Sequence, residues 1–369
     1  MNGAFPSGLL SAAVQKFLNI EVSGRKGPGY MRIDIILESN APPETVAALG
    51  SLAEDVGLGG VWVSNMNDAR DPFINFVDLA RSTSSIRIGP IAVSPFELHP
   101  LKMAASLLTL NEVTGGRAQI VVGAGGGTAT AMGVHRDRPV RAVRECVEIL
   151  QAAARGEPVQ YTGEIYQVRW YHPSWVNSAA PLIYVGANGP QMLRSAARYA
   201  DGIMVSDFVP EHVRTARAII DASLADSGRE RDAFRLNNFW AWHVKESAEA
   251  AAREARIWLA VRGTLYPGYI DDVLDPDEAK IVNTNISAFI KAYHAKSPDI
   301  EGVPDEIVDK LVARATSASS IADLDHEIER LRAFKAAGLT EIALRIYDDP
   351  AASIRLIGER VLPALRDTG

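Results

Sequence analysis

The chain has 369 residues, of which 47% are hydrophobic and 22% are charged, and its formal net charge is −7. Because no basic stretch offsets this acidic balance, we exclude a nucleic acid or an acidic membrane surface as an expected partner. A single cysteine, Cys146, excludes an internal disulfide and favours a reducing, cytoplasmic setting. No uninterrupted apolar run is long enough to span a bilayer.

Residues 1–30 are interpreted as an N-terminal extension. Their apolar patch, Leu9–Leu18, differs from a secretory signal because it lacks a basic start and is interrupted by Gln15 and Lys16. We expect at most one short helix here, followed by a flexible linker from Gly24 to Gly29.

From Met31 onward, strand-like and helix-like patterns alternate along the chain. The predicted strands are Arg32–Leu37, Val61–Val63, Ile86–Val93, Gln119–Val122, Leu182–Val185, Ile203–Val205, Phe239–Val244 and Ile342–Ile346. The predicted helices are Pro43–Gly57, Phe73–Arg81, Pro100–Val113, Pro139–Arg155, Pro190–Ala200 and Ala351–Leu365, and Val159–Val168 reads as a hairpin.

Eight strand-helix units with right-handed crossovers predict a single (β/α)8 TIM barrel over residues 31–369. Residues 264–318 are too many for a loop and contain two further helical patterns, Asp277–Tyr293 and Pro304–Ala315. They predict a helical insertion between the seventh and eighth strands. An open doubly wound sheet is the alternative, because alternation alone does not show whether the sheet closes.

In a barrel, chemistry lies at the carboxyl ends of the strands, which selects a short set of polar and glycine residues. These are Glu38, Asn40, Ser64, Asn65, Asn67, Asp68, Ser94, Glu97, Gly125 to Thr128, Asn188, Ser206, Asp207, Trp242 and Asp348. The run Gly123–Gly127 indicates a backbone that comes close to a flat or anionic ligand, with a plain flexible loop as the alternative. It is not a dinucleotide fingerprint, since Thr128 replaces the third glycine.

Glu38 follows the apolar residues Ile35–Leu37, so we expect a raised pKa and a role as a general acid. A carboxylate that caps the following turn is the alternative. His135 is a candidate for binding an anionic part of the substrate, although Arg136 and Arg138 beside it are equally typical of a solvated face.

No known hydrolase, kinase or metal pattern occurs. The seven histidines are scattered, and neither H-E-x-x-H nor paired cysteines are present, so no metal site is expected. The G-x-S-x-G elbow and the phosphate-binding P-loop are also missing. Chemistry carried by a bound cofactor is therefore the economical interpretation.

Several motifs in order resemble the luciferase-like monooxygenase superfamily. They are Gly115-Gly116-Arg117, Val122-Gly123-Ala124-Gly125, Tyr161-Thr162-Gly163-Glu164 and Pro181 to Gly202. The chain is most similar to the deazaflavin branch, and within it to methylenetetrahydromethanopterin reductases, from Met31 to about Leu365.

The resemblance implies a barrel that holds coenzyme F420, or alternatively FMN, at the strand ends, together with a non-prolyl cis peptide between Ile91 and Ala92. The residues implied for the cofactor are Ser64, Asn65, Ile91, Ala92, Ala124, Gly125, Gly126, Gly186, Ala187, Asn188, Gly189 and Pro190. Asn67, Asp68 and His135 are assigned to the substrate side. The family usually forms homo-oligomers, and we expect the same here.

Two positions depart from patterns in the branch. Many members have Asp-His where this chain has Asn65-Met66, and the sugar-phosphate dehydrogenases place a Glu where this chain has Gly126 and Gly127. A glucose-6-phosphate dehydrogenase is therefore not expected. Glu38 falls near the glutamate that the methanopterin reductases place at the end of the first strand, which supports its choice as the catalytic residue.

The predicted function is hydride transfer between C5 of F420 and a small organic substrate, for which a tetrahydropterin carrying a one-carbon unit is a candidate. Three alternatives remain at this point. One is an FMN-dependent monooxygenase, and another is a flavin-independent reductase of the methylenetetrahydrofolate type. The third is a barrel that binds cofactor without catalysis, which Asn65-Met66 keeps open.

Overall fold

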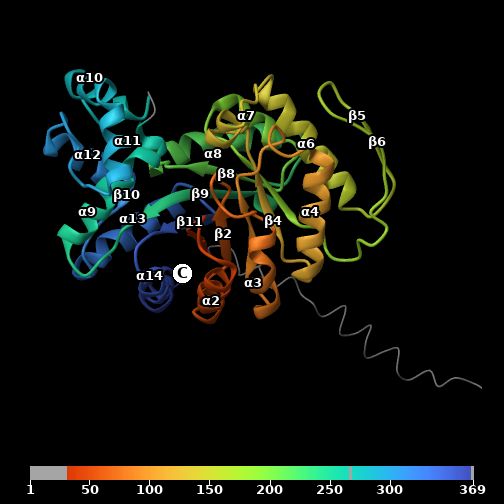
Figure 1. Ribbon diagram of the computed structural model, residues 1–369, viewed down its shortest axis with the longest axis horizontal. Coiled ribbons are helices and arrows are strands. Elements are labelled where there is room, and N and C mark those ends of the chain that lie inside the picture. The colour runs from red at the N-terminus through yellow and green to blue at the C-terminus, as the bar shows by residue number, and fades with distance from the viewer. Residues whose placement is uncertain (1–30, 266–267, 367–369) are drawn as a thin grey trace, which may run out of the picture. The chain divides into compact units, whose positions relative to one another are not determined.

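The computed structural model describes residues 31–265 and 268–366, so the predicted extension of residues 1–30 lies outside the described residues. Parallel strands form the centre of the described part, and helices surround them (Figure 1). The central strands are β1 (Arg32–Leu37), β2 (Gly60–Ser64), β3 (Arg87–Ile91), β4 (Gln119–Val122), β7 (Leu182–Gly186), β8 (Gly202–Ser206), β9 (Arg235–Trp242) and β11 (Glu341–Ile346).

Hydrogen bonds join these strands in the order β3-β2-β1-β11-β9-β8-β7-β4. The two strands at the ends of this order meet through single parallel bridges, Ile88 with Ala118 and Val93 with Val122. The ring therefore closes at a seam between β3 and β4. This confirms the predicted (β/α)8 barrel with its insertion before the last strand, and it excludes the open doubly wound sheet.

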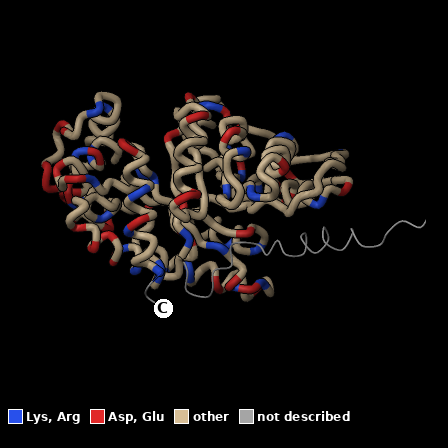
Figure 2. The backbone as a smooth tube through the Cα atoms, turned by 90° about the horizontal axis from the view of Figure 1, so that it is seen from below, with Lys and Arg blue, Asp and Glu red and all other residues tan. Residues whose placement is uncertain are grey.

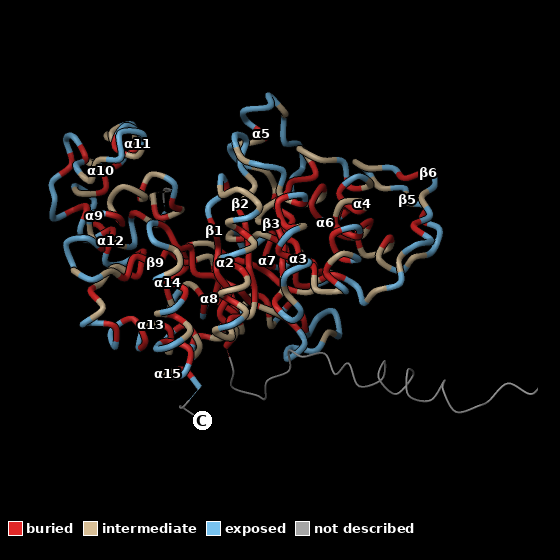
Figure 3. The backbone as a smooth tube through the Cα atoms, turned by 60° about the horizontal axis from the view of Figure 1, so that its bottom comes forward, coloured by how far each residue is buried: buried red, intermediate tan, exposed pale blue. Residues whose placement is uncertain are grey.

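Helices cover the outside of the ring with their apolar faces, so that burial is greatest at the strands (Figure 3). The helices that follow the strands are α2 (Pro43–Asp55), η1 (Ile74–Phe76), α3 (Val77–Ser82), α4 (Pro100–Val113), α5 (Gly127–Ala131), α6 (Pro139–Ala153), α7 (Pro190–Ala196), α8 (Pro210–Asp226), α13 (Leu324–Ala336), α14 (Pro350–Leu356), the π-helical η7 (Ile357–Val361) and α15 (Leu362–Arg366). The strands β5 (Val159–Thr162) and β6 (Gln167–Tyr171) form the predicted hairpin, and η2 (Arg231–Ala233) precedes β9. Among the described residues, no helix is both long and apolar enough to cross a membrane.

The segment between β9 and β11 forms its own small hydrophobic core, which includes Leu259, Phe289 and Leu311. Its elements are α9 (Ala248–Trp258), η3 (Leu259–Val261), η4 (Gly263–Leu265), η5 (Ile270–Asp272), α10 (Pro276–Thr284), α11 (Ile286–Ala295), α12 (Asp305–Ala315), β10 (Thr316–Ser317) and η6 (Ile321–Asp323). The single helix predicted over Asp277–Tyr293 is two helices, because Asn285 donates its side-chain amide to the Ile281 carbonyl at 2.9 Å where α10 ends.

A buried polar layer fills the N-terminal end of the barrel. Arg32 contacts Asp34 at 2.7 Å and Glu341 at 3.2 Å, and Arg235 contacts Glu341 at 2.7 Å. Tyr184 donates its hydroxyl to Glu341 at 2.7 Å. Burial raises the pKa of Asp34; burial also disfavours the charge of Glu341, but Arg32 and Arg235 outweigh it and hold the pKa of Glu341 low. These contacts join β1, β7, β9 and β11 at the end of the barrel opposite the strand carboxyl ends.

Polar residues also explain where the predicted strand boundaries were wrong. The seventh ring strand, β9, begins at Arg235 rather than at the predicted Phe239. The predicted strand began just after the polar residues Asn237 and Asn238, yet both are buried in β9. Asn238 donates to the Phe208 carbonyl at 2.9 Å, and Asn237 donates to Glu341 at 3.2 Å, so both side-chain amide nitrogens find acceptors inside the barrel.

We expect Gly89→Ala to destabilise the protein by more than about 3 kcal/mol, because a side chain at this point of the seam has no room. A Cβ added at Gly89 would lie 1.7 Å from the backbone oxygen of Gln119. The matched control is Gly127→Ala, where nothing lies within 4 Å of the added atom. Chemical unfolding followed by circular dichroism measures both variants. Equal stability of Gly89→Ala and the wild type would contradict the importance of the close seam.

Candidate active site at the carboxyl ends of the strands

The upper part of the β3–β4 seam contains small residues and an unusual peptide bond. The bond between Ile91 and Ala92 is cis, as the resemblance implied. A Cβ added at Gly123 would lie 2.9 Å from Cβ of Ala92, so glycine is needed for this close approach. Gly123 also donates its N–H to the Val93 carbonyl at 3.0 Å. The two strand ends therefore form one continuous surface of small residues.

Asn65, at the end of β2, binds this surface from the neighbouring strand. Its backbone N–H donates to the Ile91 carbonyl at 2.7 Å, and its side-chain amide donates to the Ala92 carbonyl at 3.2 Å. The same amide donates to Glu97 Oε2 at 2.8 Å. Ser64 pairs with Ile91 in the β2–β3 register. The structure thus brings together Ser64, Asn65, Ile91 and Ala92, and it adds Glu97.

Burial raises the pKa of Glu97 above its ordinary value, although the hydrogen bond from Asn65 opposes this shift. Its side chain is partly buried at the start of the segment that leads into α4. The sequence placed Glu97 among the strand-end residues without a role. It is a carboxyl group that keeps a proton more readily than an ordinary glutamate does, and it is joined by one hydrogen bond to the candidate site.

The end of β4 leaves its backbone accessible. Gly125 has a positive φ of 81°, and Arg136 donates to the Gly125 carbonyl at 2.6 Å. An added Cβ would meet nothing within 4 Å at Gly126 or at Gly127, where α5 begins. Ala124 lies between these glycines and Gly123 and is partly exposed. The glycine run therefore presents open backbone at the start of a short helix, and the sequence had not predicted that helix.

The end of β7 lies beside the end of β4. A Cβ added at Gly186 would lie 3.9 Å from Cα of Gly123, and the Ala187 N–H donates to the Met204 carbonyl at 3.1 Å. Gly189 and Pro190 form the N-cap and the first turn of α7, with open space at Gly189. Asn188 differs from the others in that its side chain bonds to both backbone groups of Ser206, at 2.9 and 3.1 Å.

Glu38 has a different environment from the one that its apolar neighbours predicted. Arg345 of β11 donates to Glu38 Oε2 at 2.5 Å, and the Ser39 N–H and hydroxyl donate to Oε1 at 2.9 and 3.1 Å. Burial favours the neutral acid, but these partners outweigh it and lower the pKa of Glu38. The expected raised pKa was therefore wrong. Glu38 is a carboxylate near neutral pH.

Arg345 is itself held firmly. Its side chain is only 7% exposed, its Nη1 donates to the Ile346 carbonyl at 2.6 Å, and its guanidinium lies 4.6 Å from the centre of the Tyr347 ring. Arg345 was not among the residues predicted for the site. The available signal was a charged residue inside the otherwise apolar strand Ile342–Ile346.

The insertion contributes aromatic side chains next to this ion pair. The ring centres of Trp258 and Tyr347 lie 4.6 Å apart, and those of Trp258 and Tyr293 lie 5.4 Å apart. Burial raises the pKa of Tyr293, and the carboxylates of Glu38 and Asp68 raise it further. We call Trp258, Tyr293 and Tyr347 the aromatic wall. It lies beside Glu38, and the sequence analysis did not identify it.

The residues assigned to the substrate side lie farther from one another than the residues assigned to the cofactor do. Asn67, Asp68 and His135 are all exposed. Asp68 acts electrostatically on Tyr293 of the aromatic wall, which places it on the Glu38 side of the barrel mouth. His135 lies between α5 and α6, next to Arg136, which binds Gly125. The three residues therefore do not form one cluster with Glu38.

Comparisons with known proteins identify the family of the chain. Residues 24–341 match the family model described as luciferase-like monooxygenase. A 5,10-methylenetetrahydromethanopterin reductase from Archaeoglobus fulgidus is 31% identical over 321 residues, which cover 85% of this chain and 94% of the relative. The reductase of the same name from Methanopyrus kandleri is 26% identical over 345 residues, covering 88% and 96%.

Solved structures share the fold. The coenzyme F420-dependent tetrahydromethanopterin reductase from Methanopyrus kandleri superposes with a TM-score of 0.78 at 22% identity, covering 91% of this chain and 99% of that one. An F420-dependent secondary alcohol dehydrogenase, solved with an F420-acetone adduct, superposes with a TM-score of 0.73 at 19% identity over 92% of this chain. From the extent of the family match and the identity to the Archaeoglobus fulgidus relative, the chain belongs to the luciferase-like monooxygenase family.

Proposed function

We propose that this protein is an F420-dependent oxidoreductase that transfers a hydride between the cofactor and a small organic substrate. The observation that carries the proposal is the surface where Asn65, Ala92 and Gly123 meet at the closed seam of the barrel. Its relatives include F420-dependent reductases that match over most of this chain.

The residues fit such a cofactor. A flat ring requires a surface without protruding side chains, which Ala92 and Gly123 provide. An anionic linker requires free backbone N–H groups, and the open space at Gly126, Gly127 and Gly189 leaves such groups accessible at two helix starts. We assign the ring to Ser64, Asn65, Ile91 and Ala92. We assign the linker to residues 124–126 and 186–190. In the second group, Asn188 fixes the loop after β7 through its two hydrogen bonds to the Ser206 backbone.

When bound, F420 supplies C5 of its deazaflavin ring as the hydride donor or acceptor. The protein must then hold or release the accompanying proton. When the protein lowers the pKa of one carboxyl group and raises the pKa of another, the first can act as a base and the second as an acid. Glu38, held ionised by Arg345, is the proton acceptor, and Glu97, with its raised pKa, is the proton donor.

The substrate side is formed by Glu38, Asp68 and the aromatic wall. A group of aromatic rings in edge and tilted contact favours a substrate with a flat ring, and an ionised carboxylate accepts hydrogen bonds from the N–H groups of such a ring. A tetrahydropterin carrying a one-carbon unit has both features. We therefore propose 5,10-methylenetetrahydromethanopterin, the compound named for the relatives, as the first substrate to assay.

Parallel titrations test the proposed cofactor. We expect F420 to quench the protein fluorescence with saturation, since Trp258 lies in the aromatic wall at the barrel mouth and Trp62 lies inside the barrel. We expect weaker or no quenching by FMN and NADPH. Tight FMN binding would instead favour the monooxygenase, and turnover with NADPH alone would favour a flavin-independent reductase. Absence of binding to all three would contradict the proposal.

Glu38→Gln is expected to lower kcat about 100-fold with reduced F420 and methylenetetrahydromethanopterin, because glutamine keeps the shape of the side chain but cannot accept a proton. F420 affinity should stay near the wild-type value, since Glu38 lies away from the seam surface. Glu44→Gln, at an exposed position in the first turn of α2, is the control. An unchanged kcat would remove Glu38 from the mechanism.

Glu97→Gln is expected to change the pH profile of substrate reduction. The protonated fraction of Glu97 falls as the pH rises through its raised pKa, so kcat/KM of the wild type should decline on the basic side of that value. Glutamine cannot lose a proton, so the variant should be slower and should lack this decline. A variant that keeps the wild-type profile would show that another group donates the proton.

A further inference from the structure

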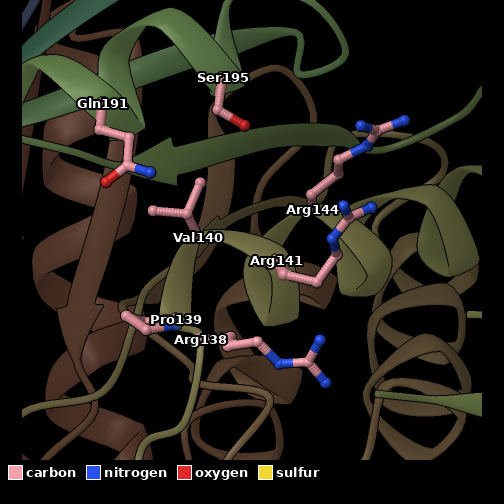
Figure 4. A pocket seen from close by; sticks show the side chains of 7 residues that line it. All are labelled: Arg138, Pro139, Val140, Arg141, Arg144, Gln191 and Ser195. Atoms are coloured by element: carbon pink, nitrogen blue, oxygen red, sulfur yellow. The ribbon is translucent and has the colours of Figure 1, made fainter. Parts of the chain in front are cut away.

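A basic groove lies outside the barrel between α6 and α7 (Figure 4). It consists of two adjoining cavities of about 420 and 570 Å³ that share Val140, Arg144, Gln191 and Ser195. The arginines that line it are Arg138, Arg141, Arg144, Arg194 and Arg198. We call this feature the arginine groove.

The arginine groove keeps an excess of positive charge after its internal ion pairs are counted. Arg138 and Arg141 both contact Glu164 at 2.9 Å, so one carboxylate serves two guanidinium groups. Arg144 contacts Glu148 at 2.7 Å. Among the described residues, Arg194 has no acidic partner within salt-bridge distance, and Arg198 makes one long hydrogen bond, to Ser223 at 3.4 Å.

The groove continues directly from the proposed cofactor site. Gln191 lines both cavities and is the second residue of α7, immediately after the Gly186–Pro190 segment assigned to the cofactor linker. Arg138 lies at the N-cap of α6. A chain that leaves the barrel between the ends of β4 and β7 therefore enters the groove at the N-terminal ends of two helices, where negative charge is stabilised.

We propose that the arginine groove binds the oligoglutamate tail of F420, an inference that rests on the proposed cofactor. Each glutamate of the tail brings a carboxylate, and arginine is the side chain best suited to hold carboxylates. FMN ends at its phosphate and has no group to reach the groove. The groove thus discriminates between the two cofactors that the family fold can hold.

The distribution of charge supports this occupant. Residues 264–318 contain ten acidic and five basic residues, and acidic residues gather at the insertion end of the molecule (Figure 2). A polyanion attached to the cofactor is repelled from that side of the barrel mouth. The arginine groove lies on the other side, in a chain whose net charge is −7.

The test compares F420 carrying one glutamate, F420 carrying several, and the deazaflavin riboside that lacks both phosphate and tail. Affinities are measured by fluorescence titration at low and high salt. In the wild type, the long-tail form should bind more tightly than the short form, and the difference should shrink as salt rises. The double variant Arg194→Gln with Arg198→Gln should weaken long-tail binding roughly fivefold and leave the riboside unaffected.

Arg360→Gln is the matched control, because Arg360 is an exposed arginine on η7, remote from the groove in the fold. If the double variant binds the long-tail form as tightly as the wild type does, the inference is overturned while the proposed function stands. If no deazaflavin species binds to the wild type, both fail. Equal weakening of all three species would also overturn the inference, since it would show a general loss of the site rather than of tail contacts.

Discussion

The close approach of β3 and β4 is the constraint on which both the fold and the candidate site depend. Along this seam, Gly89 lies against the Gln119 backbone and Gly123 lies against Ala92, so that neither glycine can carry a side chain. Only single bridges pair the two strands, at Ile88 with Ala118 and at Val93 with Val122. The barrel closes through close backbone approaches at these two glycines, and the lack of a side chain at Gly123 leaves a smooth surface at its open end.

The two ends of the barrel use charge in opposite ways. At the N-terminal end, Arg32 and Arg235 both form ion pairs with the buried Glu341. At the carboxyl end, Arg345 pairs with a Glu38 that is about half exposed, and Glu97 has no cationic partner in the described residues but accepts a hydrogen bond from the Asn65 amide. The ion pairs at the N-terminal end connect neighbouring strands, and the Glu341 carboxylate is buried where a ligand does not reach it. The arrangement at the carboxyl end leaves two carboxyl groups accessible, one ionised and the other inclined to keep its proton.

The order of strands, the insertion and the glycine-rich ends could be predicted, because each is a local pattern of the sequence or a motif of the family. The cis peptide between Ile91 and Ala92 followed from the resemblance alone. The environment of Glu38 could not be predicted, since it depends on the register that pairs Ile36 with Arg345, more than 300 positions along the chain. The aromatic wall and the boundary of β9 were missed for the same reason, because tertiary contacts decide them.

A crystal structure of the protein with F420 bound tests the central claim most directly. We expect the deazaflavin ring to pack on Ala92 and Gly123 within hydrogen-bonding reach of Asn65, with its linker between the glycine ends of β4 and β7. Glu38 and Glu97 should both face the reacting side of the ring. A ring bound elsewhere on the barrel, or a seam surface covered by the protein's own side chains in the complex, would contradict the account.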